Sequence, residues 1–193
     1  MAILLSIHRI IRAGSRKAHS DGSISADAEI LSMTVESMLE SGLKNFQISV
    51  GHSQFFYGLT KAAGLSGEQE ENLRELIANK NFFGVEEFVD SLSMNDKLRK
   101  LFGLLDNFDL QDEQLMEALK LAKGYDEILS SIDTLLKLRE YLKAYGIEKY
   151  ISYELGLISD YTYYTGIIFQ GYTYGTGEPI VKGGRYDKLL SHF

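Results

Sequence analysis

The chain has 193 residues and a formal net charge of -7 at neutral pH, and 45% of its residues are apolar. This composition is typical of a globular domain and excludes disordered and fibrous classes, while the negative charge disfavours non-specific binding to nucleic acids. There is no cysteine, which excludes disulfides and thiolate metal sites, and no apolar run approaches the length of a membrane span.

The missing cysteine and the scattered histidines bear on location and cofactors. A chain without cysteine suits the reducing cytosol, so a cytoplasmic location is expected. The histidines are His8, His19, His52 and His192, and no pair has the spacing of metal ligands on a helix. We therefore expect neither a metal nor a cofactor, and neither a membrane nor a nucleic-acid partner.

The first twenty residues form a basic segment. They contain Arg9, Arg12, Arg16 and Lys17 and no acidic residue. An arginine-rich, acid-free start is typical of a mitochondrial transit peptide. We favour the simpler interpretation, a solvated end or a start truncated from something longer, and keep the transit peptide as the alternative.

A helix is predicted over residues 25–41. Ser25 can cap it, Asp27 suits its first turn, and Gly42 follows its last turn. Its apolar stripe consists of Ile30, Leu31, Val35, Met38 and Leu39.

The next segment, NFQISVGH, alternates between apolar and polar residues. Phe46, Ile48 and Val50 point to one face, and Gln47 and Ser49 point to the other. This pattern predicts a half-buried strand.

Between residues 53 and 145 the signals are helical and most segments are short. Apolar residues recur with i, i+3, i+4 spacing in EQEENLRELIANK, VEEFVDSL, NDKLRKLFGLL and DEQLMEALKLAK. The last helix is long and ends at Gly146, with Ile128, Ile132, Leu135, Leu136 and Leu142 on one face. No fixed repeat period is present, so a solenoid is not expected.

The composition changes again after residue 146. Ten of the twelve tyrosines lie at position 141 or later, and YISYEL and YTYYTGIIFQGYTY are rich in aromatic and β-branched residues, which predicts strands. GTGEP then turns the chain, and IVK returns as a short strand before Gly183. Alternation puts Tyr161, Tyr163, Thr165, Ile167 and Phe169 on one face, and Thr162, Tyr164, Ile168, Gln170 and Tyr172 on the other.

The order of elements is helix, strand, helical lobe and antiparallel strands. Segregated helices and strands predict an α+β fold rather than an alternating α/β fold. We interpret residues 1–193 as one partial domain, in which 1–52 and 146–193 form the sheet core and 53–145 form a mainly helical insertion.

The run Gly183-Gly184-Arg185-Tyr186, at the end of the last strand, is the candidate binding site. Glycine lets a ligand approach the backbone closely, arginine is the usual bidentate partner of a carboxylate, and tyrosines can wall a flat pocket. A small ligand with a carboxylate and a ring suits this set. The candidate ligand-binding residues are Tyr163, Tyr164, Gly183, Gly184, Arg185 and Tyr186. The alternative is a turn that carries a surface arginine.

No catalytic residue is predicted. His52 directly follows a strand, where a structural hydrogen bond and a role in a site are both open to it. Acidic pairs such as Glu86–Glu87 are interpreted as a solvated helix face, and we find no general acid–base pair among them.

Two C-terminal motifs resemble a known family. YYTGIIFQGYTYGTGEPIVKGGRYDKLL is similar to two histidine-binding signatures of the histidyl-tRNA synthetase catalytic core, a Tyr-Tyr strand and Gly-Gly-Arg-Tyr-Asp-x-Leu. It is more similar to a synthetase-like paralogue, the regulatory subunit of ATP phosphoribosyltransferase, which carries YYTG, a hairpin with GEP, and GGRYD. ADAEIL…GLKNFQISVGH also resembles that subunit, so the resemblance extends over residues 25–193.

The resemblance implies a class II aminoacyl-tRNA synthetase-like fold: an antiparallel sheet with flanking helices and a helical insertion. It also implies a non-catalytic subunit that joins a short-form ATP phosphoribosyltransferase catalytic subunit in a hetero-oligomer. Such a subunit supports the first step of histidine biosynthesis and helps histidine to inhibit it. Arg185 is then expected to clamp the carboxylate of a histidine ligand, with Tyr163, Tyr164 and Tyr186 as pocket walls.

Departures from the synthetase pattern separate the two paralogues. The synthetase has a catalytic arginine four residues before its paired tyrosines, where this chain has Ser159, and an acidic residue where this chain has Gln170. Losing a cation that steadies the reacting carboxylate and phosphate removes transition-state stabilisation. Both changes argue against adenylation chemistry. A fragment of a histidyl-tRNA synthetase catalytic domain is kept as the alternative.

Motifs expected on both sides of this region are absent. We find no dimer-forming motif and no ATP-binding arginine motif before residue 25, and no third core motif after GGRYDKLL. We therefore interpret the chain as an interior portion of the regulatory subunit. A sheet that lacks strands exposes edges that pair with other chains, so a homodimer or higher oligomer is expected.

Overall fold

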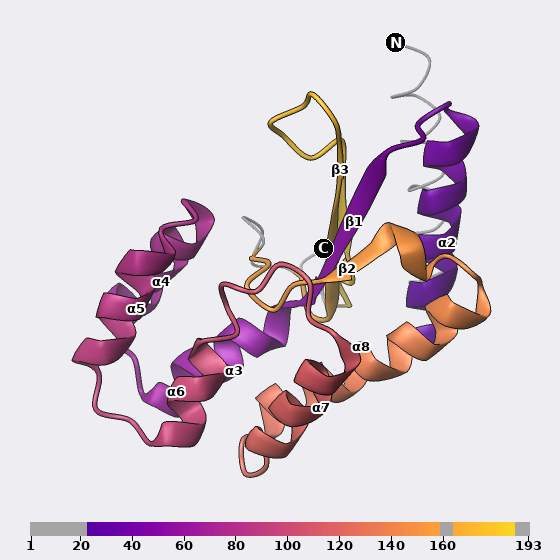
Figure 1. Cartoon of the computed structure of the whole chain (residues 1–193). Coiled ribbons are helices and arrows are strands. Elements are labelled where there is room, and N and C mark those ends of the chain that lie inside the picture. Colours follow the sequence, from indigo (N-terminus) through magenta and orange to yellow (C-terminus); the bar gives the residue numbers. More distant parts are fainter. Residues whose placement is uncertain (1–22, 159–163, 188–193) are drawn as a thin grey trace.

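The computed structural model describes residues 23–158 and 164–187, arranged as Figure 1 shows. Its helices are α2 (Ile24–Glu40), α3 (Ser53–Ala63), α4 (Gly67–Ala78), α5 (Phe82–Ser91), α6 (Asp96–Phe102), α7 (Asp112–Leu121) and α8 (Asp126–Ala144), with a 3-10 turn η1 (Glu148–Tyr150). Its strands are β1 (Phe46–His52), β2 (Ile151–Tyr153), β3 (Ile167–Thr173) and β4 (Val181–Gly184). The predictions for the basic first segment, Ser159 and Tyr163 lie outside the described residues. None of the described helices is both long enough and apolar enough to cross a membrane.

The strands form one sheet in the order β2-β1-β3-β4. β1 pairs antiparallel with β3, from Phe46 opposite Thr173 to His52 opposite Ile167, and β3 pairs antiparallel with β4. β2 pairs in parallel with β1, which differs from the expected antiparallel arrangement. The connection explains the difference, because parallel neighbours need a long crossover and residues 53–150 supply one.

One face of the sheet carries the hydrophobic core. α2 and α8 pack on each other, and α8 packs on β1; Figure 1 shows α2 to the right of the strands and α8 below them. Ile48 and Val50 are fully buried on this face, as the alternation predicted. Phe46 stacks on Tyr150 with ring centroids 4.8 Å apart. Ser49, which points to the other face, is buried as well because the helical part of the chain covers some of that face.

α2 begins slightly earlier than predicted. Its N-cap is Ser23, whose hydroxyl accepts the backbone N–H of Ala26 at 3.3 Å. Ser25, the predicted cap, lies inside the first turn, and its hydroxyl pairs with that of Ser23 at 2.7 Å, so this prediction was wrong. Asp27 does lie in the first turn, where the helix dipole favours a carboxylate.

The predicted short helices are confirmed as α4, α5, α6 and α7. Ser66 and Gln69 form a capping box at the start of α4. Asn81 and Asn95 cap α5 and α6 by accepting backbone N–H groups at 3.1 and 3.0 Å. α8 ends before Gly146, as predicted, and that glycine has φ 68°.

The predicted insertion shares its core with the sheet. α8 lies within residues 53–145 and contacts both α2 and β1, and α3 packs on α8. Buried residues from both parts of the chain form one connected cluster. α4 and α5 pack mainly on each other, on the left of Figure 1. The division at residues 52 and 146 stays a prediction based on the sequence.

A substitution at Gly156 tests how closely the insertion packs on the segment that follows β2. A Cβ at Gly156 would lie 2.0 Å from the Leu105 carbonyl oxygen. Gly156→Ala therefore forces the backbone to move, and we expect it to lower the free energy of unfolding by about 2–3 kcal/mol in urea unfolding. Gly67→Ala is the matched control, because a Cβ there meets nothing within 4 Å. Equal stabilities of the two variants would contradict the close packing.

Candidate functional site

Strand alternation gives the sheet a second, polar face. Backbone pairing places Ser152 of β2 opposite Ser49 of β1, Ser49 opposite Gln170 of β3, and Gln170 opposite Lys182 of β4. These side chains stand in one line across the described strands, because paired residues share a face. We name the set Ser152, Ser49, Gln170 and Lys182 the polar row.

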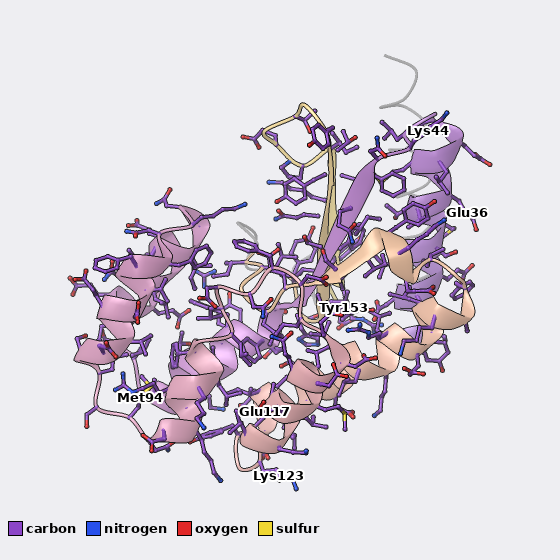
Figure 2. All side chains as sticks on the ribbon, in the orientation of Figure 1. Glu36, Lys44, Met94, Glu117, Lys123 and Tyr153 are labelled. Atoms are coloured by element: carbon purple, nitrogen blue, oxygen red, sulfur yellow. The ribbon has the colours of Figure 1, made fainter. Side chains whose placement is uncertain are left out.

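A cleft of about 810 Å³ lies over the polar row. Its opposite wall includes Ile77 in α4, Lys80 just after α4, and Phe108 in the loop before α7. Tyr153, labelled in Figure 2, lines the cleft from β2. The helical insertion thus turns an open sheet face into a concave surface, which is the usual shape of a small-molecule site.

Hydrogen bonds order the polar side chains of the cleft. The Tyr172 hydroxyl donates to Gln170 Oε1 at 2.5 Å, and the Ser49 and Ser152 hydroxyls pair at 3.3 Å. Glu154 lines the same cleft just after β2. Burial raises the pKa of its carboxyl, although a hydrogen bond from Ser49 opposes the shift. The cleft therefore presents a carboxyl, an amide and several hydroxyls on one surface.

The Tyr153 hydroxyl is buried and, within the part of the chain that the structure describes, has no hydrogen-bond partner. Burial raises the pKa of this hydroxyl. The Arg139 guanidinium lies 4.9 Å from the centroid of the Tyr153 ring, held by Asp112 at 2.8 Å and by the Leu110 carbonyl at 3.0 Å. A buried polar group without a partner costs about 1–3 kcal/mol, so this hydroxyl lowers the stability of the fold.

Two aromatic rings of the chain pack so closely on Gly183 and Gly184 that neither position has space for a Cβ atom. A Cβ at Gly183 would lie 2.4 Å from the Phe169 ring, on the core face. A Cβ at Gly184 would lie 2.6 Å from the Tyr164 ring, on the cleft face. The rings of Phe169 and Tyr164 thus pack closely on these two glycines, and the close approach of a ligand stays a prediction.

Arg185 lies on the core face. Its guanidinium binds the Asp27 carboxylate of α2, with Nε–Oδ1 at 3.2 Å and Nη2–Oδ2 at 2.7 Å. Nη2 also donates to the Ser23 carbonyl at 2.7 Å. The chain is still extended here, because the Arg185 N–H donates to the Ile167 carbonyl of β3 at 2.7 Å.

The predicted cluster is thus divided between the two faces of the sheet. Gly184, Tyr164 and Tyr186 share the cleft face, with the two ring centroids 6.4 Å apart, while Gly183 and Arg185 belong to the core face. Tyr163 lies outside the described residues. The role of Arg185 as a ligand clamp stays a prediction. In the structure its guanidinium forms an ion pair with the Asp27 carboxylate.

His52 ends β1 and caps α3. Its Nδ1 accepts the backbone N–H of Gln54 at 3.2 Å, and its side chain is buried. Burial first, and then the positive charge of Arg185, lower the pKa of His52 from 6.5 to about 4. The imidazole is therefore neutral near pH 7, and this geometry is the structural hydrogen bond considered for it from the sequence.

The sequence singled out Gln170, but it did not predict the rest of the polar row, Tyr153 or Glu154 as part of a site. Ser49 and Ser152 are 103 positions apart, so no local motif marks them as neighbours. Glu86 and Glu87 are exposed on α5, as predicted. Within residues 23–158 and 164–187, no group of three or more His, Asp or Glu side chains is placed to hold a metal ion.

Comparison with known proteins identifies the family. A family model described as histidyl-tRNA synthetase matches residues 19–193. This chain belongs to the histidyl-tRNA synthetase family. Curated relatives named ATP phosphoribosyltransferase regulatory subunit are 37% identical in Acetivibrio thermocellus and 40% identical in Desulforamulus reducens. Both alignments cover 87% of this chain but only 40% and 42% of the relatives, so the chain spans about two fifths of their length.

Solved structures confirm the fold. An ATP phosphoribosyltransferase regulatory subunit/histidyl-tRNA synthetase from Bacillus halodurans matches with a TM-score of 0.77 and 31% identity, over 89% of this chain and 45% of that one. An ATP phosphoribosyl transferase (HisG:HisZ) complex from Thermotoga maritima shares the fold at a TM-score of 0.60 and 22% identity, over 85% and 57% of the two chains. The predicted α+β, class II synthetase-like fold and the resemblance to the regulatory subunit are therefore confirmed.

Neutral His52 makes the stability of this member of the synthetase family depend on pH. Unfolded histidine binds a proton near pH 6.5, whereas folded His52 does so only near pH 4, so acid favours the unfolded chain. Stability from this residue is present above pH 6.5 and should fall by up to about 3 kcal/mol as the pH drops towards 4. Urea unfolding of the wild type and of His52→Asn, which keeps a capping side chain, measures the difference. A wild-type-minus-variant difference that stays constant from pH 7 to pH 4.5 would contradict the lowered pKa.

Tyr153→Phe tests the unpaired hydroxyl. The variant keeps the ring beside Arg139 and removes a buried polar atom, so we expect the free energy of unfolding to rise by about 0.5–1 kcal/mol in thermal unfolding. Tyr172→Phe is the matched control, because it removes the bond to Gln170 and should lower stability by about 1 kcal/mol. If Tyr153→Phe destabilised the chain as much as Tyr172→Phe, the Tyr153 hydroxyl would have to be paired.

Proposed function

We propose that this chain is part of a non-catalytic regulatory subunit of ATP phosphoribosyltransferase, a glycosyltransferase. In this role it supports the first step of histidine biosynthesis and its feedback inhibition by histidine. The observation that carries the proposal is the shared name of curated relatives 37% and 40% identical over 87% of this chain. The Bacillus halodurans structure bears the same description beside that of the synthetase. The activity of a whole subunit is part of the proposal, because the chain spans about two fifths of those relatives.

One residue of the cleft, Gln170, supports binding rather than adenylation. Gln170 stands where the resemblance aligns an acidic residue of the synthetase, and it accepts a hydrogen bond from the Tyr172 hydroxyl. Adenylation develops charge on a carboxylate and a phosphate, and charges fixed in advance stabilise such a transition state. A neutral amide at the centre of the polar row supplies no such charge.

The charge of the helical insertion supports the absence of a nucleic-acid partner. Residues 53–145 contain 17 acidic and 11 basic side chains. This excess of negative charge repels a phosphate backbone, whereas binding to RNA draws on clustered lysine and arginine. A subunit that binds only another protein and a small ligand does not need a basic surface.

The proposed partner is the short-form ATP phosphoribosyltransferase catalytic subunit, in a hetero-oligomer that also contains at least two copies of the regulatory chain. The fold is compatible with such an assembly, because the Thermotoga maritima complex contains it. A cytoplasmic location belongs to the same proposal.

We propose that a histidine ligand binds on the cleft side of the predicted cluster. Tyr164 and Tyr186 lie there with ring centroids 6.4 Å apart, and such rings pack well on an imidazole. Glu154 and Gln170 line the adjoining cleft and can accept hydrogen bonds from an amino group. The proposal includes no metal and no cofactor.

A fragment of an active histidyl-tRNA synthetase is the second candidate. The description of the matching family model favours it. Gln170 in the polar row and the acidic insertion weigh against it, for the reasons of charge given above.

Light scattering on a size-exclusion column tests the proposal. The chain is run alone, with a short-form catalytic subunit, and with histidine transfer RNA. We expect co-elution with the catalytic subunit and none with the RNA, because the proposed role is docking and the insertion is acidic. Histidine-dependent ATP–pyrophosphate exchange, which measures adenylation directly, should be absent.

An unrelated acidic protein of similar size serves as the control for non-specific association with the catalytic subunit. Co-elution with transfer RNA together with histidine-dependent exchange would reject the regulatory role in favour of the synthetase. A chain that binds neither partner would reject the docking part of the proposal.

A further inference from the structure

Arg185 and Asp27 form a two-pronged ion pair between positions 158 residues apart in the chain. Two guanidinium nitrogens meet two carboxylate oxygens at 3.2 and 2.7 Å, and the Ser23 carbonyl accepts a further bond at 2.7 Å. The Arg185 and Asp27 side chains are only 14% and 8% exposed, so solvent screens the pair weakly. A fork of this kind fixes the direction of the arginine as well as its distance.

The backbone and stem of Arg185 are fixed as well. Its N–H donates to the Ile167 carbonyl at 2.7 Å, and its carbonyl accepts the Thr165 N–H at 2.8 Å. The stem lies over Gly166, where a Cβ would be 2.8 Å from Arg185 Cδ. Arg185 therefore joins the end of β4 both to β3 and to the first turn of α2.

The fixed arginine determines where the next side chain points. Successive residues of an extended segment face opposite sides of a sheet, so Tyr186 faces the cleft side, where its ring lies near that of Tyr164. Beyond it, the Asp187 N–H donates to Thr165 Oγ1 at 3.1 Å, and that hydroxyl donates to Asp187 Oδ2 at 2.7 Å. Contacts on both sides of Tyr186 thus hold its backbone in place.

We infer that Arg185 is a positioning residue: held by Asp27, it fixes the end of β4 so that Tyr186 completes a tyrosine wall with Tyr164, and it does not contact the ligand. The inference rests on the proposed function, in which a histidine ligand binds against that wall. A ligand carboxylate that took the guanidinium would deprive the buried Asp27 carboxylate of it, which is strongly unfavourable.

His52 gives an independent measure of where Arg185 lies. After burial, the charge of Arg185 is the second cause of the lowered pKa of His52. If Arg185 stays on Asp27 when a ligand binds, the titration of His52 followed by NMR does not move. If Arg185 instead turns to a ligand carboxylate, its positive charge leaves the position from which it lowers the pKa of His52, and that pKa rises.

Calorimetric titration of histidine into the wild type, Asp27→Asn, Arg185→Gln and the double variant separates the two roles. A positioning pair predicts that each single variant binds histidine about tenfold or more weakly. The double variant should bind no worse than either single one, because both changes remove the same contact. A clamp predicts that Asp27→Asn keeps or raises the affinity while Arg185→Gln abolishes binding, and that pattern would overturn the inference.

A readout without ligand keeps the test decisive if a variant is unstable or histidine does not bind. NMR contacts between the Tyr164 and Tyr186 rings should weaken in Asp27→Asn, and Arg185→Lys, which keeps the charge but not the fork, should retain part of them. Arg99→Gln, which breaks an ion pair with side chains 38% and 68% exposed, is the control and should leave them unchanged. Unchanged ring contacts in Asp27→Asn would overturn the inference.

The outcomes also separate the positioning role from the proposed function. A wild-type chain that binds no histidine contradicts the ligand part of the proposed function, while the ring contacts still decide the role of Arg185. Histidine binding that raises the pKa of His52 supports the ligand and overturns the positioning role.

Discussion

In the central strands β1 and β3, every second side chain points to the core face and the residues between them belong to the cleft face. A shift of one residue in this register would exchange the two sets, burying Gln170 and exposing Phe169. The same alternation continues past the end of β4, where the Arg185 side chain lies on the core face and the Tyr186 side chain lies on the cleft face. The separation of a packed face from a cleft face therefore follows from backbone geometry, and it also divides a motif that is continuous in the sequence.

The long connection between β1 and β2 builds the other half of the site. It returns the chain in the direction of β1, which makes β2 parallel, and it brings α4 and the loop at Phe108 over the polar face. Polar groups of Tyr153 and Glu154 are buried in this region, and burial raises the pKa values of both side chains. Buried polar groups that are incompletely paired are expected at functional sites. The cleft is for this reason a better candidate for binding than the core.

The synthetase fold and the synthetase reaction make different demands on the sequence. The fold needs the alternation of β1 and β3 and the glycines beneath Phe169 and Tyr164, and this chain meets those demands. The reaction needs fixed charges where charge develops, and Gln170 carries none. A subunit that senses histidine can use the same surface for binding alone. Function is therefore argued from the site, and the fold by itself does not decide it.

Local signals in the sequence by themselves determined the elements and the family. Apolar spacing marked α4 to α8, alternation marked β1, and the spacing of YYTG and GGRYD marked the family. Only the tertiary structure decided which residues meet: the parallel partner of β1, the contact of Ser49 with Ser152, and the pairing of Arg185 with Asp27. The physical reason is that helix and strand patterns depend on near neighbours, whereas the partner of a side chain depends on how distant segments pack. The sequence predicted Arg185 as a ligand clamp, which stays a prediction, and the fold adds the partner that the sequence did not show, the Asp27 carboxylate.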